Sequence, residues 1–386
     1  MPSFLDIDAL IGDPQTRIVV CCGAGGVGKT TTAAALGLRA AESGRRVVVL
    51  TIDPARRLAQ SLGLTTLDNT PRPVDDINNT GGGSLDAMML DMKRTFDEVV
   101  QAHAAPDKAE QILANPFYQA VSSSFAGTQE YMAMEKLGQL KLEADSDPGN
   151  RRWDLIIVDT PPSRSALDFL DAPKRLGSFL DGRFIRLLAV PAKAGGRAYL
   201  KIFSAGVNIV TSTLTKVLGG QMLSDVQTFV AALDTMFGGF RERADHTYAL
   251  LKDGGTAFLV VAAPERDALR EASYFVDRLD EEEMPLAGVV INRVYRVSAP
   301  GLSAARALSA AEQLAEESDG VDSLAITEGL LRLHAVQAEI AARHQSLIKR
   351  FVGGHSGIPM VEVPAASGDI HDLDGLRTVG EALAGL

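Results

Sequence analysis

Seven short hydrophobic runs, each bounded by turn-forming residues, divide the chain. They lie at residues 18–22, 47–50, 85–90, 155–158, 257–262, 286–291 and 358–363. Runs that are short and continuously apolar are typical of strands buried on both faces of a parallel sheet. The pattern therefore predicts an α/β fold with a doubly wound, mainly parallel sheet.

The first two runs belong to one local unit. A glycine-rich turn follows the run at 18–22, an alanine-rich stretch then extends to Ala41, and Gly44 stands where a helix would end before the run at 47–50. Glycine is the preferred residue just past a helix C-terminus. Residues 17–50 are therefore predicted to form a strand, a turn, a helix and a second strand.

Two long intervals, 93–143 and 173–253, have helical spacing instead. Within the second, apolar residues recur every three or four positions, at Phe203, Val207, Val210, Leu214 and Val217 and again at Leu223, Val226, Val230, Leu233, Phe237 and Phe240. This spacing predicts two amphipathic helices between Arg197 and Leu251. We interpret both intervals as helical insertions, forming a subdomain within a single domain of residues 1–386.

Length and composition fit one large folded unit. The 386 residues exceed the roughly 250–300 at which a single core stops growing, which agrees with a domain that carries insertions. The composition of 46% hydrophobic and 23% charged residues excludes wholesale disorder. The net charge of −11 argues against a nucleic-acid partner, because a phosphate backbone would be repelled.

The cysteines and the termini favour a cytoplasmic protein. Cys21 and Cys22 are neighbours inside an apolar run, so they make neither an ordinary disulfide nor a spaced metal pair. No apolar run approaches the roughly 20 residues that span a bilayer, and the acidic N-terminus does not resemble a basic signal sequence. The C-terminal segment from Leu373 has helical spacing and acidic residues, which favours a docking helix over a membrane anchor.

A phosphate-binding loop follows the first predicted strand. The residues Gly23-Ala24-Gly25-Gly26-Val27-Gly28-Lys29-Thr30 fit the pattern G-x-x-x-x-G-K-[ST] between a strand and a helix. In such loops backbone N–H groups hold the phosphates, the lysine neutralises them and the hydroxyl contacts Mg²⁺. We predict ATP and Mg²⁺ as ligands. The predicted nucleotide contacts in this loop are Gly23, Gly25, Gly26, Val27, Gly28, Lys29, Thr30 and Thr31.

Two aspartates end predicted strands. Asp53 and Asp159 each follow an apolar run, and Pro54 stops the chain after the first of them. Ligands bind at the carboxyl ends of strands in doubly wound sheets, so Asp159 suits a magnesium shell. A helix N-cap for Asp53 and a turn cap for Asp159 remain alternatives.

The loop resembles the deviant Walker A motif of the MinD, ArsA and nitrogenase iron protein class, usually written G-K-G-G-V-G-K-[ST]. Thr51-Ile52-Asp53-Pro54-Ala55 and Asp159-Thr160-Pro161-Pro162 resemble the two switch motifs of the ArsA and Get-pathway ATPases. Val289-Val290-Ile291-Asn292 resembles their adenine-contacting strand end, and the region of Pro364 resembles their adenine-side loop. Together these motifs span residues 30–365 in the order of the ArsA/Get-like branch.

The resemblance implies a dimeric switch ATPase with a P-loop fold. It implies that Lys29 and Asp53 are both catalytic, with Asp53 positioning the attacking water. It implies further that Thr30, Asp53 and Asp159 surround the metal ion. It also implies that Asn292 and Pro364 contact the adenine. Taken by itself, Asn292 is equally well explained as a turn residue.

One departure from the resembled motif concerns partners. In that class the first lysine of the loop reaches the γ-phosphate of the other subunit, and here its place is taken by Ala24. A homodimer is therefore expected to be slow, and a heterodimer with a lysine-bearing paralogue would complete the site. Arg56 and Arg57 are candidate replacements, although an exposed helix face explains them better.

A second departure from the resembled family concerns the residues that would bind a substrate. Arsenite pumps use spaced cysteines and the targeting ATPases often carry a C-x-x-C zinc site, and this sequence has neither. The resemblance leaves a hydrophobic client or a membrane-protein partner, and Met222, Met236 and Phe237 would suit an adaptable groove for it. An apolar stripe at helical spacing is, however, more often part of the protein core, and that is the stronger interpretation here. A non-catalytic nucleotide-binding regulatory subunit and a partitioning or septum-type ATPase remain alternatives.

Overall fold

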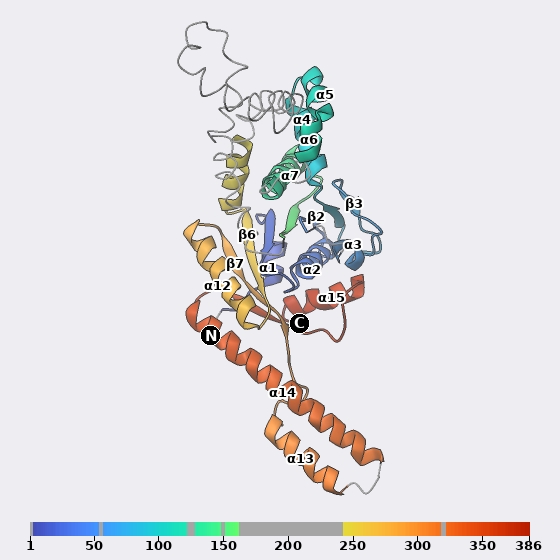
Figure 1. The fold of residues 1–386 in the computed structure, drawn as a ribbon, viewed down its shortest axis with the longest axis vertical. Coiled ribbons are helices and arrows are strands. Elements are labelled where there is room, and N and C mark those ends of the chain that lie inside the picture. Colours follow the sequence, from blue (N-terminus) through green and yellow to red (C-terminus); the bar gives the residue numbers. More distant parts are fainter. Residues whose placement is uncertain (1–2, 54–56, 122–127, 148–150, 162–241, 318–321) are drawn as a thin grey trace, which may run out of the picture.

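The computed structural model describes residues 3–53, 57–121, 128–147, 151–161, 242–317 and 322–386. Eight strands form one sheet in the order β3-β4-β2-β5-β1-β6-β7-β8 (Figure 1). Every neighbouring pair is parallel except β3 with β4. The predicted α/β fold with a mainly parallel sheet is therefore confirmed.

All seven hydrophobic runs form strands. The strands are β1 (Ile18–Cys22), β2 (Arg46–Thr51), β3 (Arg72–Pro73), β4 (Ser84–Met89), β5 (Leu155–Asp159), β6 (Thr256–Ala262), β7 (Leu286–Val294) and β8 (Met360–Pro364). The sequence analysis missed β3, which is two exposed residues long and leaves no hydrophobic pattern.

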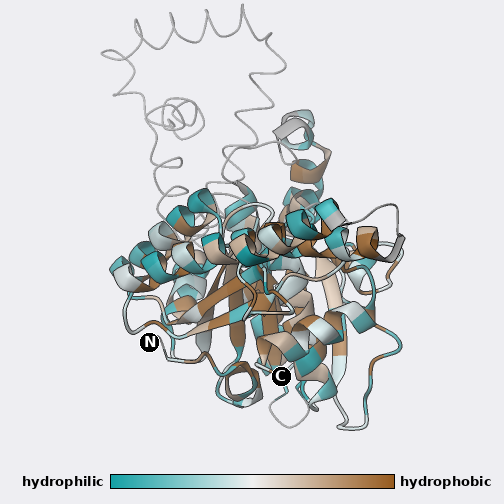
Figure 2. Cartoon of the chain, turned by 90° about the horizontal axis from the view of Figure 1, so that it is seen from below, coloured by the Kyte–Doolittle hydropathy of each residue, from teal (hydrophilic) through white to brown (hydrophobic). Residues whose placement is uncertain are grey.

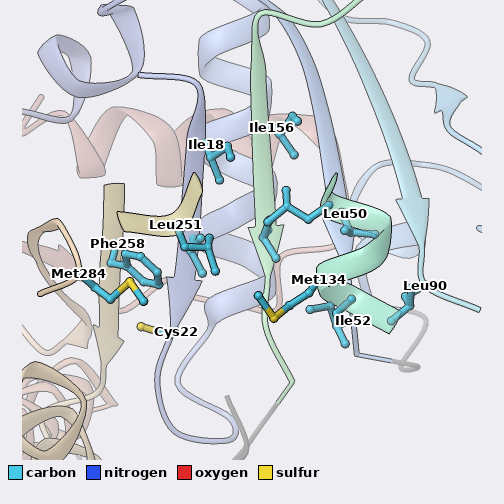
Figure 3. Close-up of a cluster of buried hydrophobic side chains, with 14 of the residues drawn as sticks. Ile18, Cys22, Leu50, Ile52, Leu90, Met134, Ile156, Leu251, Phe258 and Met284 are labelled. Carbon is cyan, nitrogen blue, oxygen red and sulfur yellow. The ribbon is translucent and has the colours of Figure 1, made fainter. Parts of the chain in front are cut away.

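The core lies on both faces of the sheet. Every residue of β1, β5 and β6 is buried, which explains why these runs are apolar without alternation. Ile18 and Cys22 pack into a cluster with Phe258 (Figure 3), and Val20 belongs to the same cluster. Val19 and Cys21 belong to the cluster on the opposite face. Figure 2 shows these hydrophobic strands beneath helices that carry many hydrophilic residues.

Helices pack around the sheet. They are α1 (Ile7–Gly12), α2 (Lys29–Glu42), α3 (Arg57–Ser61), α12 (Arg266–Glu281) and α15 (Leu373–Leu383). The C-terminal helix α15 packs against α2, and its Leu376 and Leu383 are fully buried. The expected docking helix is therefore present. No helix among the described residues is both long and apolar enough to cross a membrane.

The first helical interval is helical where the structure describes it. It contains α4 (Met92–His103), α5 (Pro106–Ala114), α6 (Pro116–Val121) and α7 (Thr128–Asp145). In the second interval the structure describes a helix over residues 242–252. Most of the two predicted amphipathic helices, including Met222, Met236 and Phe237, lies outside the described residues.

A long helical hairpin was not anticipated. Helices α13 (Ala304–Glu317) and α14 (Asp322–Gly354) pack against each other and project away from the sheet (Figure 1). On α14, Ala335 is buried while Ile326 and Leu333 are exposed. Apolar residues on two faces obscure the single stripe by which an amphipathic helix is recognised.

Candidate nucleotide-binding site

The loop between β1 and α2 packs against the ends of two neighbouring strands. A Cβ atom on Gly23 would lie 2.0 Å from the carbonyl oxygen of Val261 in β6. At Gly28, where φ is 96°, a Cβ atom would lie 2.2 Å from Nδ2 of Asn292 in β7. Both glycines have a positive φ, 146° at Gly23 and 96° at Gly28, and neither position has room for a Cβ atom, so glycine is required at both.

Lys29 is the first residue of α2 and its ammonium group lies inside the loop. Its side chain is buried, and Nζ donates a hydrogen bond to the carbonyl oxygen of Ala24 at 2.9 Å. Burial lowers the pKa of Lys29, and the nearby Asp159 carboxylate opposes that shift. The lysine charge and the positive end of the helix dipole therefore lie together, as an anion site requires.

Asp159, at the end of β5, is fully buried beside this loop. Its Oδ2 atom accepts hydrogen bonds from Oγ1 of Thr30 and Oγ1 of Thr51, both at 2.8 Å. Its Oδ1 atom is buried and has no hydrogen-bond partner. A buried acceptor without a partner costs about 1–3 kcal/mol, and hard cations such as Mg²⁺ prefer oxygen ligands of this kind. Asp159 and Thr30 therefore fit a magnesium ion.

Burial raises the pKa of Asp159 to about 6, although hydrogen bonds from Thr30 and Thr51 oppose the shift. The folded chain then binds a proton that the unfolded chain releases near the ordinary pKa of 3.8. This carboxyl group therefore makes the protein less stable as the pH rises from about 4 to about 6, and the loss is complete above that window.

Asp159→Asn should accordingly stabilise the nucleotide-free, metal-free protein, and by about 1 kcal/mol more at pH 8 than at pH 5, because the amide removes the ionised form. Urea unfolding at the two pH values measures this difference. Asp154→Asn is the control, since burial raises the pKa of Asp154 but hydrogen bonds from Arg46 outweigh it and lower the pKa. That variant should change stability equally at both pH values, and the same flat result for Asp159→Asn would contradict the assignment.

Asp53 follows β2 and is partly buried. Its backbone N–H donates to Oγ1 of Thr51 at 3.2 Å. Its carboxylate raises the pKa of both Lys29 and Asp159, so it contributes to the same electrostatic site. Of the two candidate replacement cations, Arg57 is exposed at the start of α3, and Arg56 lies outside the described residues.

The predicted adenine-side residues lie at the same edge of the sheet. Nδ2 of Asn292 donates to the carbonyl oxygen of Val27 at 2.9 Å, so the structure brings Asn292 to the loop. Pro364 ends β8 and is in register with Val294 of β7, two residues beyond Asn292. The adenine contacts themselves remain predictions. Thr31, in the first turn of α2, is half-buried.

Sequence analysis missed two residues of this site. Thr51 lies opposite Asp159 in the β2–β5 register, and its hydroxyl donates to the Asp159 carboxylate. The position of Thr51 at the end of a predicted strand could have identified it as a site residue. Arg293 has a left-handed backbone (φ 60°), and its Nη1 atom donates to the carbonyl oxygen of Gly26 at 2.8 Å. Nothing in the sequence pattern pointed to this contact.

Three residues beside the site, Ala24, Cys21 and Cys22, contribute neither a charged group nor a reactive thiol. Ala24 is buried and packs in the same cluster as Val27. Cys21 and Cys22 are buried and free, and burial raises the pKa of both thiols, that of Cys22 to about 12. In the part of the chain that the structure describes, no cluster of three or more His, Cys, Asp or Glu residues could hold a metal ion.

Comparison with known proteins decides the family. A family model described as "Anion-transporting ATPase" matches residues 16–301, about three quarters of the chain, and includes the loop, Asp53, Asp159 and Asn292. The chain belongs to the anion-transporting ATPase family. It is therefore an ATPase of P-loop type.

Individual relatives agree with this assignment. The chain is similar to ATPase ARSA2 of Chlamydomonas reinhardtii, with 26% identity over 291 residues that cover 74% of this chain and 70% of the relative. It is similar to ATPase GET3 of Ajellomyces dermatitidis, with 26% identity over 289 residues, 74% of this chain and 75% of the relative. Protein Rv2184c of Mycobacterium tuberculosis is 30% identical over 207 residues, 48% of this chain and 44% of the relative.

Proposed function

We propose that this chain binds Mg-ATP at the loop 23–31 and hydrolyses it as a dimer-dependent switch. The observation that carries the proposal is the buried, unpartnered Oδ1 atom of Asp159 beside the Thr30 hydroxyl and the Lys29 ammonium group. A buried anion next to a buried cation at a helix N-terminus would suit a divalent metal ion and a phosphate group, respectively.

Each residue then has a defined task. Lys29 neutralises the β- and γ-phosphates, while Thr30 and Asp159 hold the metal ion with Asp53 nearby. Bound Mg²⁺ supplies charge neutralisation on the phosphate oxygens. Asp53 orients the attacking water, and Asn292 and Pro364 border the adenine.

The partner that we propose follows from the absence of a lysine at position 24, where this chain has Ala24. Without a lysine at this position the chain cannot provide a cation from the loop to a second subunit, so a homodimer should be slow. We propose pairing with a paralogue that retains the lysine. In such a pair the complete site is the one on this chain, and Asp53→Asn here should eliminate turnover.

We propose a cytoplasmic ATPase in which residues 93–143 and 173–253 form a helical subdomain of one domain spanning 1–386. That subdomain would handle a hydrophobic client or a membrane-protein partner. The two buried cysteines, whose pKa values are raised, make arsenite an unsuitable ligand.

Ala24→Lys tests the missing cation directly. The variant should raise the ATP turnover of the purified chain by about tenfold or more, because a charge that acts across subunits can contribute about 10³–10⁵ in rate. Phosphate release under saturating Mg-ATP measures the effect.

Ala24→Met is the matched control for that variant, since methionine adds a long unbranched side chain without charge. It should leave turnover at the wild-type level. An equal rise in both variants, or no rise with lysine, would contradict the account of the missing cation. A wild-type chain that binds ATP and never releases phosphate would instead favour the regulatory-subunit alternative.

A further inference from the structure

Two neighbouring side chains at the end of β7 contact the phosphate-binding loop. Nδ2 of Asn292 donates to the carbonyl oxygen of Val27 at 2.9 Å. Nη1 of Arg293 donates to the carbonyl oxygen of Gly26 at 2.8 Å. The backbone N–H of Arg293 in turn donates to Oδ1 of Asn292 at 2.9 Å. Two consecutive peptide groups of the loop are therefore held by two consecutive residues of one strand.

A register shift in β7 explains how consecutive side chains reach the same loop, since successive side chains of a regular strand point to opposite faces. The shift lies between Ile291 and Val294, where β7 places two residues, Asn292 and Arg293, opposite one residue of β8. An extra residue of this kind turns a strand locally and redirects a side chain. Glycine would adopt the left-handed backbone (φ 60°) without strain, so the arginine found there points to a task for its side chain.

The strand end that carries the two residues is fixed by its own contacts. Val294 is fully buried, and its carbonyl oxygen accepts a hydrogen bond from the backbone N–H of Ala365 at 3.0 Å. The backbone N–H of Tyr295 donates to Nδ1 of His344 on α14 at 3.2 Å. The loop, by contrast, has four glycines among residues 23–28, and glycine adopts many backbone conformations. The strand is therefore the rigid partner, and its contacts select the conformation of the loop.

The contacts also set the direction of backbone N–H groups in the loop. A planar trans peptide has its carbonyl oxygen and its N–H on opposite sides, and the described backbone contains no cis peptide. Because the carbonyl groups of Gly26 and Val27 point at β7, the N–H groups of Val27 and Gly28 point away from it. Backbone N–H groups of such loops are the donors that hold phosphate oxygens. A loop that is already ordered in this way loses less conformational freedom when it binds.

We propose that Arg293 is a positioning residue for the phosphate loop, where it acts with Asn292 to hold two peptide groups in the orientation that binds phosphate. This rests on the proposed function, because it takes the loop 23–31 as the phosphate site. Arg293 acts through the loop, whereas Lys29 and Asp159 act on the ligands themselves. The Arg293 side chain is exposed, so it can be replaced without opening the core.

Arg293→Gly removes the side chain and relieves the left-handed backbone at the same time. The affinity for Mg-ATP should fall by about tenfold in isothermal titration calorimetry, because binding must then order a loop residue that the contact had fixed. The thermal unfolding temperature should stay near that of wild type, since glycine adopts this backbone without strain. A purely structural role predicts the opposite pattern, with a changed unfolding temperature and an unchanged affinity.

Magnesium tripolyphosphate separates the phosphate loop from the adenine side. It has the phosphate chain of ATP without the nucleoside, so Arg293→Gly should weaken its binding by the same factor. A loss confined to ATP would mean that Arg293 acts on the base and would overturn the proposal. Arg293→Lys should stay within about threefold of wild type for both ligands, because the contact uses one donor and not the two-pronged fork that lysine lacks. A lysine variant as weak as the glycine variant would also overturn it.

Glu283→Gly is the matched control for the backbone change. Glu283 is also an exposed residue with a left-handed backbone (φ 55°), and it lies just before β7 begins, at the opposite end of the strand from Arg293. Its replacement should leave the affinity for both ligands unchanged. Wild-type affinity in Arg293→Gly, together with lost binding in Lys29→Ala, would overturn the positioning role and leave the proposed function standing. A wild-type chain that does not bind Mg-ATP would overturn both.

Discussion

Lys29→Ala should lower the affinity for Mg-ATP by at least about 100-fold, measured by isothermal titration calorimetry. The structure places the Lys29 ammonium group inside the loop, 2.9 Å from the carbonyl oxygen of Ala24 and at the start of α2. Lys29 is the only buried cation among the described residues of this site, so the substitution would leave a bound phosphate without a buried positive charge.

Lys136→Ala provides the matched comparison. Lys136 is also a buried lysine, and its Nζ atom pairs with Glu98 at 2.9 Å between α7 and α4. Its removal should lower stability without changing ATP affinity. An affinity for ATP that survives Lys29→Ala would mean that the nucleotide binds elsewhere.

Asp53→Asn should leave ATP binding within about threefold of wild type and reduce turnover by about 100-fold or more, because orienting an attacking water contributes about 10²–10⁴ in rate. The amide keeps the size of the side chain and removes the charge that raises the pKa of Lys29 and Asp159. Calorimetry and phosphate release on the same preparation separate the two effects.

Asp91→Asn is the control for that substitution. Asp91 caps α4 by accepting a hydrogen bond from the backbone N–H of Arg94 at 3.0 Å, and asparagine caps helices equally well. Neither binding nor turnover should change. If Asp53→Asn weakened binding and turnover in equal measure, Asp53 would act as a structural cap and the catalytic assignment would be wrong.

The sheet was predictable because its strands are buried on both faces. Continuous apolar runs such as 257–262 leave a strong sequence signal, and the order strand, glycine loop and helix fixed where the phosphate site had to lie. The edge strand β3 had no such signal because both of its residues are exposed.

The contacts between distant segments were less predictable. Asp159 stood in a motif, but the hydrogen bond that it accepts from the Thr51 hydroxyl depends on the β2–β5 register. The Arg293 contact with Gly26 depends on a left-handed residue that favours glycine and was therefore not expected at an arginine. The α13–α14 hairpin was missed because α14 is apolar on two faces.

The most direct test of the central claim is phosphate release from Mg-ATP by the purified wild-type chain, with the Asp53→Asn variant as the blank. The account predicts release that is slow, that requires Mg²⁺, that exceeds the blank and that rises in Ala24→Lys. Release that is independent of Mg²⁺ and equal in wild type, Asp53→Asn and Ala24→Lys would contradict it.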